Sequence, residues 1–243
     1  MSETAIWHDV ECGVYAADLA LWEELAGGSD RATLELGCGT GRVALHLARR
    51  GNEVWAVDRD PALTAELERR AHREGLSVHV TTADIRELDL DALFTLVAAP
   101  MQVMQMLGGE RGRGRALERC AAHLAPDGLL AAAIVEGAPE ESVGDGRDLL
   151  PDVRELDGWI YSSQPLDVRA DGAAIEIRRL RQRVSPAGGL EERLHTERLE
   201  LLDAEALEAE AARAGLRPAG RRSIETTDAH VGSTVVLLSP EAT

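Results

Sequence analysis

The feature that most constrains the fold is a run of three glycines at alternate positions, directly after a short apolar stretch. The run reads Glu35-Leu36-Gly37-Cys38-Gly39-Thr40-Gly41. The apolar residues 33–36 predict a buried strand, and residues 42–50 have the spacing of an amphipathic helix. Glycine lacks a Cβ, so it adopts backbone angles and permits close approaches that other residues do not. We therefore expect a strand–turn–helix unit whose main chain lies directly against a ligand.

The spacing of these glycines discriminates between classes of ligand. A P-loop requires a lysine after its last glycine, and the chain contains no lysine. A nicotinamide- or flavin-binding turn requires Gly-x-Gly-x-x-Gly/Ala. That pattern fits only in the register Gly39, Gly41 and Ala44, which leaves Gly37 unexplained. A tight turn without a ligand is the remaining alternative, although three glycines cost conformational entropy that such a turn does not require.

Aspartates follow the next two predicted strands. The stretch 53–58 predicts a buried strand ending at Asp58, and 77–82 predicts another that is followed by Asp84. An acid at the tip of the second strand, about twenty residues past the glycines, can accept hydrogen bonds from ribose hydroxyls. Asp60 precedes a proline and is expected to cap the intervening helix. Asp58 is therefore the aspartate available to a ligand.

These acids and glycines, in this order on three successive strand ends, resemble the cofactor motifs of the class I S-adenosylmethionine (SAM)-dependent methyltransferases. The resemblance covers most of residues 30–136 in detail and the remainder by general layout. It implies direct in-line transfer of a methyl group from SAM to an O, N or C nucleophile of a small molecule, with S-adenosylhomocysteine (SAH) as product. It also implies that Asp84 accepts from the adenine amino group while the backbone N–H of Ile85 meets the ring. The residues expected to bind the cofactor are Glu35, Gly37, Cys38, Gly39, Gly41, Asp58, Arg59, Asp84, Ile85, Pro100 and Met101.

Two other functions stay open at this point. One is a non-catalytic accessory protein that binds SAM or SAH on the same fold. The other is an NAD(P)-dependent oxidoreductase that uses the Gly39, Gly41 and Ala44 register.

Alternating strand and helix patterns up to residue 136 predict parallel strands joined by right-handed crossovers. Three segments with strand character follow, 153–168, 173–185 and 191–202, joined by the hairpin turns 170–172 and 186–189. A loop rich in glycine and arginine is expected at 108–114. We predict an α/β fold: a Rossmann-like, doubly wound seven-stranded sheet with an inserted antiparallel three-stranded lid and an N-terminal helical cap. The predicted single domain, 1–243, comprises the cap 1–30, the cofactor-binding core 31–136, the inserted sheet 150–202 over the active site and the C-terminal part of the core 203–243.

Candidate residues for the acceptor pocket and for catalysis are less specific. Tyr15 belongs to an N-terminal segment that in such methyltransferases often folds over the cofactor. Met104 is a candidate for a pliable apolar pocket wall, and Trp159 and Tyr161 share one face of a predicted strand. The candidate bases are His195, which shares a strand face with Glu197 and Leu199, and also Glu136, Tyr161 and His230. A base is needed only where the acceptor must lose a proton early.

Composition narrows the range of partners. The chain has 43 acidic and 26 basic residues and a net charge of −17. Such a surface repels phosphate backbones, so we expect a small-molecule acceptor and no nucleic acid. Three cysteines without a C-x-x-C motif favour a reducing compartment, and no acidic cluster has metal-ligand spacing, so we expect no metal. With neither a signal peptide nor a long apolar run in view, we expect a cytoplasmic protein without a membrane partner. The oligomeric state is open, with a homodimer as one alternative.

Overall fold

The computed structural model describes residues 1–28, 31–137, 150–227 and 231–241. The helices, including two short 3₁₀ segments, are α1 (Glu3–Cys12), α2 (Leu19–Ala26), α3 (Arg42–Ala48), α4 (Pro61–Glu74), η1 (Ile85–Glu87), η2 (Val103–Met106), α5 (Gly109–His123) and α6 (Ala204–Ala212). The strands are β1 (Ala32–Leu36), β2 (Glu53–Asp58), β3 (Val78–Thr82), β4 (Phe94–Ala99), β5 (Leu124–Ile134), β6 (Asp152–Leu156), β7 (Trp159–Asp171), β8 (Ala174–Val184), β9 (Leu190–Glu200), β10 (Leu216–Ile224) and β11 (Ser233–Pro240).

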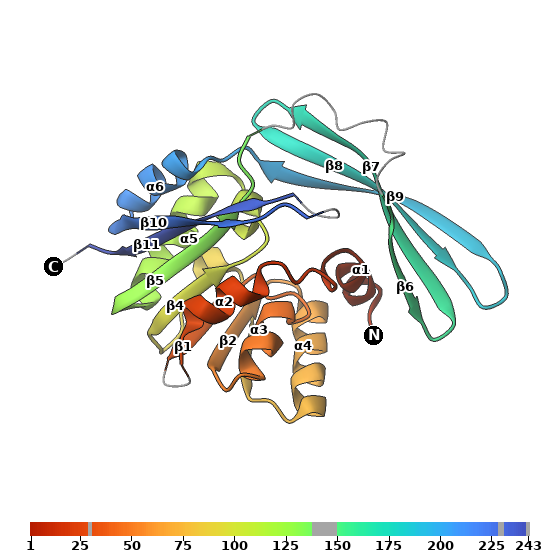
Figure 1. Cartoon of the computed structure of the whole chain (residues 1–243), viewed down its shortest axis with the longest axis horizontal. Helices are drawn as coiled ribbons and strands as arrows, with labels where there is room; N and C mark the ends of the chain where they lie inside the picture. The colour runs from red at the N-terminus through yellow and green to blue at the C-terminus, as the bar shows by residue number, and fades with distance from the viewer. Residues whose placement is uncertain (29–30, 138–149, 228–230, 242–243) are drawn as a thin grey trace.

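Two sheets organise these elements. The first has seven strands in the order β10-β11-β5-β4-β1-β2-β3, and the second has four strands in the order β6-β7-β8-β9. Strands β1 to β5 run parallel to one another, whereas β11 is antiparallel to both β5 and β10. Figure 1 shows the second sheet extending away from the first, with α1 between the core and the second sheet. The predicted seven-stranded core is confirmed.

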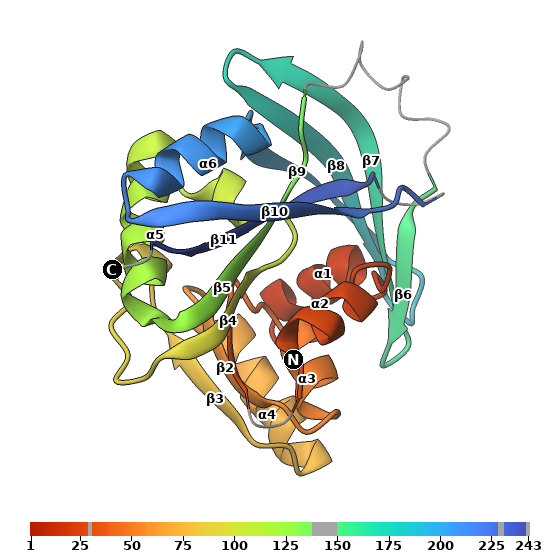
Figure 2. The same cartoon turned by 60° about the vertical axis from the view of Figure 1, so that its left-hand side comes forward.

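Helices cover both faces of the seven-stranded sheet (Figure 2). On one face α2, α3 and α4 bury Trp22, Leu47 and Leu67. On the other face α5 and α6 bury Leu117 and Leu207. Parallel strands need this double cover because both of their faces are apolar. The strand order reverses between β1 and β4, and in open α/β sheets the crevice at such a reversal is where ligands bind.

The boundaries of α4 follow directly from local sequence. The side chain of Asp60 accepts a hydrogen bond of 2.8 Å from the backbone N–H of Ala62, and Pro61 occupies the first helical position. At the other end Gly75 adopts the left-handed conformation with φ of 66°. An acidic N-cap, a proline at the first position and a C-terminal glycine are each favoured for a separate steric or hydrogen-bonding reason. The predicted capping of this helix by Asp60 is confirmed.

The predicted three-stranded lid is wrong, because the second sheet has four strands. The stretch 153–168, expected to be one strand, is divided by a two-residue turn between Leu156 and Trp159, which pair with each other. Asp157 and Gly158 both have positive φ, 51° and 78°. Two consecutive positive φ values, on Asp-Gly, characterise the tight hairpin turn whose twist matches the flanking strands.

The predicted loop at 108–114 is also wrong, because α5 begins at Gly109. Arg113 is buried within this helix and its guanidinium pairs with Glu210 of α6 at 2.6 Å and with Glu200 at the end of β9. A Cβ at Gly112 would lie 1.7 Å from the carbonyl oxygen of Leu107. Tertiary ion pairing and a close backbone approach therefore outweigh the low helix propensity of these glycines.

No helix in the described ranges is long and apolar enough to cross a membrane.

Candidate functional site

A crevice of about 400 Å³ opens at the carboxyl ends of β1 to β4. On the side of the sheet it is lined by residues of the glycine turn and of the segments that follow β2, β3 and β4. On the opposite side it is lined by His8 and Cys12 of α1, by Ile177 of β8 and by Glu197 and Leu199 of β9. Nine of the residues expected to bind a cofactor line this crevice: Glu35, Gly37, Cys38, Asp58, Arg59, Asp84, Ile85, Pro100 and Met101.

The three glycines of the turn all have positive φ, between 54° and 93°. A Cβ at Gly37 would lie 2.6 Å from Val103, one at Gly39 would lie 2.1 Å from Nε2 of His8, and one at Gly41 would lie 2.2 Å from Leu67. Glycine is thus required at each position by backbone angle and by space. Only Gly37 of the three lies among the crevice residues. Gly39 and Gly41 allow α1 and α4 to pack closely against the turn.

Glu35 has an unsatisfied oxygen inside the protein. Its side chain is 3% exposed, and Oε2 has no hydrogen-bond partner among the described residues. Burial raises the pKa of this carboxyl to about 8, against a smaller opposing effect of the Arg42 guanidinium. A buried polar atom without a partner costs about 1–3 kcal/mol. An orphaned carboxyl oxygen at the wall of a crevice indicates a position where a hydrogen-bond donor of a ligand fits.

Asp58 joins the end of β2 to the glycine turn. Its Oδ2 accepts a hydrogen bond of 2.9 Å from the backbone N–H of Gly39, and its Oδ1 accepts one of 2.9 Å from the N–H of Asp60. Each carboxylate oxygen can accept more than one hydrogen bond. The side chain therefore shapes the turn and still has lone pairs directed at the crevice, where Arg59 also lies.

Asp84 begins the short segment after β3. Its Oδ1 accepts from the backbone N–H and from Nε of Arg86, both at 2.9 Å. These hydrogen bonds from Arg86 lower the pKa of Asp84 to about 2. Ile85, the next residue, is buried and contributes an apolar surface to the crevice. Asp84 is thus a fixed carboxylate beside an apolar wall.

The segment after β4 has unusual backbone geometry. Met101 and Gln102 have positive φ of 49° and 63°, although neither is a glycine. Such strained residues gather at functional sites. Met104, expected in the pocket wall, is fully buried in the core, whereas Val103 and Met106 line the crevice. In a 3₁₀ segment residues three apart lie on one side, so Met104 points away from the side that Val103 and Met106 share.

The other residues expected in an acceptor pocket lie elsewhere. Tyr15 is buried under the guanidinium of Arg42, 5.1 Å from its ring centroid. Tyr161 packs edge-on against Trp7 of α1 at 5.5 Å, and Trp159 stacks next to Tyr161 at 6.5 Å. None of Tyr15, Trp159 and Tyr161 is among the crevice residues. They hold the second sheet to α1 and α1 to the core.

The candidate bases are not gathered at one point. His195 lies beside the crevice residue Glu197, with 3.7 Å between Nε2 and Oε1. Glu136 accepts hydrogen bonds from the backbone N–H of Ala204, at 2.8 Å, and from the hydroxyl of Thr234, which gives it a structural task. Tyr161 lies in the aromatic cluster with Trp7. His230 falls outside the described residues.

Sequence reasoning missed the contribution of α1. His8 and Cys12 are one helical turn apart and both face the crevice. Nδ1 of His8 lies 3.2 Å from the hydroxyl oxygen of Thr40, and that hydroxyl donates to Asp9 at 2.7 Å. Burial lowers the pKa of His8. The only sequence signal was the i, i+4 spacing of two reactive side chains in a helix.

Ion pairs hold α1 from both sides. Asp9, 1% exposed, pairs with Arg70 of α4 and, at 2.7 Å, with Arg154 of β6. Glu11, 6% exposed, receives two hydrogen bonds from Arg181 of β8, at 2.7 and 2.6 Å. Bidentate guanidinium–carboxylate pairs in a partly desolvated interface are the stronger type. The helix is thereby bound to the core and to the second sheet.

One group of potential metal ligands lies among the described residues: Glu11, His195 and Glu197, whose ligand atoms fall within 4.8 Å of one another. Both oxygens of Glu11 are already engaged by Arg181. A cation here would have to compete with that guanidinium, so the group does not favour metal binding.

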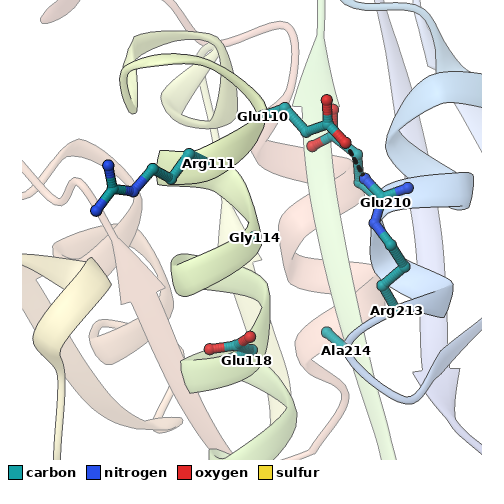
Figure 3. A pocket seen from close by; sticks show the side chains of 7 residues that line it. All are labelled: Glu110, Arg111, Gly114, Glu118, Glu210, Arg213 and Ala214. Atoms are coloured by element: carbon teal, nitrogen blue, oxygen red, sulfur yellow. Dashed lines mark hydrogen bonds and ion pairs between the residues drawn. The ribbon is translucent and has the colours of Figure 1, made fainter.

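A second hollow, of about 430 Å³, lies between α5 and α6 and is lined mainly by charged side chains (Figure 3). Arg213 pairs there with Glu110 at 2.5 Å, and Glu210 pairs with Arg113. Arg111 and Glu118 are exposed, and none of the lining residues has the buried polar atom without a partner that distinguishes the crevice.

Comparison with known proteins identifies the family. A family model described as "Methyltransferase domain" matches residues 33–128. A probable cobalt-precorrin-6B C(15)-methyltransferase (decarboxylating) from Methanothermobacter thermautotrophicus is 31% identical over 142 residues, which are 58% of this chain and 71% of that protein.

Two solved structures are similar over nearly the whole chain. The sugar N-methyltransferase KedS8 from Streptoalloteichus sp. has a TM-score of 0.77 and 22% identity, and the match covers 99% of this chain and 94% of that one. SAM-bound CalS10, an amino pentose methyltransferase from Micromonospora echinaspora, has a TM-score of 0.67 and 25% identity, over 95% of this chain and 91% of that one. Fold, family model and curated relative agree: the chain belongs to the class I SAM-dependent methyltransferases, enzymes whose cofactor is S-adenosylmethionine.

Proposed function

We propose that the crevice at the ends of β1 to β4 holds SAM and that the enzyme methylates a small molecule at O, N or C. The observation that carries this proposal is Oε2 of Glu35, buried at the crevice wall without a hydrogen-bond partner among the described residues. The α-ammonium group of SAM is positively charged and has N–H donors, so it can supply the hydrogen-bond partner that this oxygen lacks. The chain contains no lysine whose ammonium group could fill that position instead.

The remaining crevice residues suit the other parts of the cofactor. Main chain at Gly37 and Cys38 leaves room for the amino-acid part. Asp58 has lone pairs for ribose hydroxyls beyond its two backbone hydrogen bonds. Asp84 and the apolar Ile85 suit the amino group and the face of adenine. The crevice thus offers a suitable surface to each part of the cofactor in turn: the amino-acid part, the ribose and the adenine.

The nicotinamide alternative has less support. In a dinucleotide-binding turn the glycines allow the pyrophosphate to approach the main chain. Here Gly39 and Gly41 face His8 and Leu67, and neither lies among the crevice residues. At the two glycines that a dinucleotide would need, α1 and α4 therefore pack against the main chain.

SAM supplies a methyl group that is already activated on a sulfonium, so the chain's own task is alignment and exclusion of water. Ile177 and Leu199 give the second sheet an apolar surface toward the crevice. Nδ1 of His8 lies 3.2 Å from the hydroxyl oxygen of Thr40, and burial lowers the pKa of His8, which favours the neutral imidazole. Met101 and Gln102, with their strained backbone, shape the wall next to the turn.

The class of acceptor rests on relatives and on charge. KedS8 is named as a sugar N-methyltransferase and CalS10 as an amino pentose methyltransferase, which supports a small-molecule acceptor for this chain. A net charge of −17 disfavours nucleic acid. The three cysteines are free, in keeping with work in the reducing cytoplasm.

Calorimetric titration with SAH tests the cofactor half of the proposal. We expect wild-type protein to bind, and Glu35→Gln to bind about 10–100-fold more weakly, since a charged hydrogen bond contributes about 1.5–3 kcal/mol. Glu53→Gln, on the neighbouring strand and exposed, should bind as wild type does. Absence of SAH binding to the wild type would contradict the proposal. SAH binding without methyl transfer from SAM to any of a panel of sugar, amine and phenol acceptors would favour the non-catalytic accessory role.

A further inference from the structure

The crevice has a second wall that the proposed cofactor contacts do not use. It consists of Cys12 from α1, Ile177 from β8 and the two β9 residues Glu197 and Leu199. Glu197 pairs across the strands with Ile177, and Leu199 follows it on the same face of β9. A carboxylate is therefore flanked by two aliphatic side chains on the side of the crevice opposite the glycine turn.

The positive charges near this wall are already committed. Arg42 is held by Asp18, with 2.7 Å between Nη2 and Oδ2, and Arg86 is held by Asp84. On the inward face of β8, Arg181 is bound by Glu11. Among the described crevice residues Arg59 has no carboxylate within ion-pair distance, and it follows Asp58 on the cofactor side.

Arg179, the remaining arginine on the inward face of β8 near this wall, is also engaged. Its guanidinium pairs with Asp152 of β6 and donates to the hydroxyl of Ser163 at 2.9 Å. A phosphate or carboxylate group on an acceptor needs a free guanidinium or ammonium for recognition. No described residue of this wall offers one.

Glu197 itself remains available. Its side chain is 43% exposed, and its Oε1 lies 3.7 Å from Nε2 of His195, beyond hydrogen-bonding distance. The nearby carboxylate of Glu11 is already bound by Arg181. A carboxylate between Ile177 and Leu199 in a crevice with low-dielectric walls attracts a cation more strongly than one on an open surface. The wall thus matches a group with a positive charge and an apolar body.

We infer that Glu197 binds a protonated amine of the methyl acceptor, and that the acceptor carries no phosphate or carboxylate where it meets β9. This inference rests on the proposed function, because it assigns the acceptor side of the same crevice. It selects amines, such as amino sugars without a nucleotide, over acids and phosphorylated molecules. Glu197 is then a specificity-determining residue, and the two aliphatic neighbours accept the ring or chain of the acceptor.

Three probes that share a cyclohexane ring and carry a positive, a neutral or a negative substituent test the inference: cyclohexylammonium, cyclohexanol and cyclohexanecarboxylate. Each is titrated into protein saturated with SAH and followed by ligand-observed NMR. We expect cyclohexylammonium to bind best and cyclohexanecarboxylate not to bind. In Glu197→Gln the affinity for the ammonium should fall about tenfold, as expected for one lost charge-assisted hydrogen bond.

Glu192→Gln is the matched control, because Glu192 lies on the same strand with opposite side-chain direction and is exposed. It should leave ammonium binding unchanged. The inference is overturned by equal or tighter binding of the carboxylate, by ammonium affinity that survives in Glu197→Gln, or by the absence of binding of all three probes. SAH affinity is measured first in wild type and both variants, so a failure of the cofactor assignment appears there and not in the probe titrations.

Discussion

The backbone N–H of Gly39 donates a hydrogen bond of 2.9 Å to Oδ2 of Asp58. Nineteen positions separate the two residues, and the hydrogen bond links the turn after β1 to the end of β2. The other carboxylate oxygen accepts from the N–H of Asp60 at the start of α4. One side chain therefore sets the relative positions of the turn and of the helix that follows the neighbouring strand.

This geometry predicts two losses from the single change Asp58→Asn. The amide has one accepting oxygen, so one of the two backbone N–H groups loses its acceptor and the protein melts at lower temperature. Cofactor affinity should fall about 10–100-fold, measured by calorimetry with SAH. Asp60→Asn is the neighbouring control, because asparagine caps a helix as well as aspartate does. Equal behaviour of the two variants would refute the role given to Asp58.

Gly39→Ala should be far more damaging than an alanine at another left-handed glycine. Gly75 has φ of 66° and open space around its Cβ position, so Gly75→Ala costs about 1 kcal/mol of strain. At Gly39 the same strain adds to a Cβ only 2.1 Å from Nε2 of His8. Denaturant unfolding of both variants measures the difference. Adding His8→Ala to Gly39→Ala should recover part of the lost stability, and failure to do so would mean that the clash is not with His8.

The ligand-free protein should lose stability as the pH rises through the window set by Glu35. The folded carboxyl has a pKa of about 8, raised by burial, against an ordinary value of 4.5 in the unfolded chain. Between these values the folded state binds more protons, so the stabilising contribution is complete below pH 4.5 and is lost by about pH 8. Glu35→Gln lacks this dependence. Melting temperatures of both proteins at intervals from pH 5 to pH 8 test it, and parallel curves would contradict it.

Removal of the Glu11 charge should loosen the contact between α1 and the second sheet. Glu11→Gln leaves Arg181 partly buried without its counter-charge, which for buried pairs typically costs about 3–5 kcal/mol. The exposed pair of Arg183 and Glu191 is the control, and Glu191→Gln should change stability little. Urea unfolding compares the two. SAH affinity should also fall in Glu11→Gln, since His8 and Cys12 lie on the same helix.

Local sequence signals predicted the elements of the core because each signal has a local cause. The cap at Asp60, the proline after it and Gly75 define α4 without reference to the rest of the chain. The gathering of Glu35 and Asp84 in one crevice was predictable too. Parallel neighbouring strands bring their carboxyl ends to one edge of the sheet.

What sequence reasoning missed depends on contacts between distant segments. Helix α5 starts at Gly109 because Arg113 meets Glu210, 97 residues further on. Glu197 reaches the crevice because Arg181 of the second sheet meets Glu11 of α1. Nothing in the local pattern of either segment encodes its partner. The Asp157-Gly158 turn is different, since that dipeptide is itself a hairpin signal, and the continuous strand prediction overlooked it.

The position of α1 has a consequence for how the enzyme meets its two ligands. Through Asp9 the helix touches Thr40 beside the glycines, and through Glu11 it touches the sheet that carries Glu197. If a ligand on one side of the crevice shifts α1, it alters the free energy of binding on the other side. Thermodynamic reciprocity then requires that each molecule strengthen or weaken the other's binding by the same factor. A dissociation constant measured for either ligand alone describes a different state of the protein from the one in which the methyl group moves.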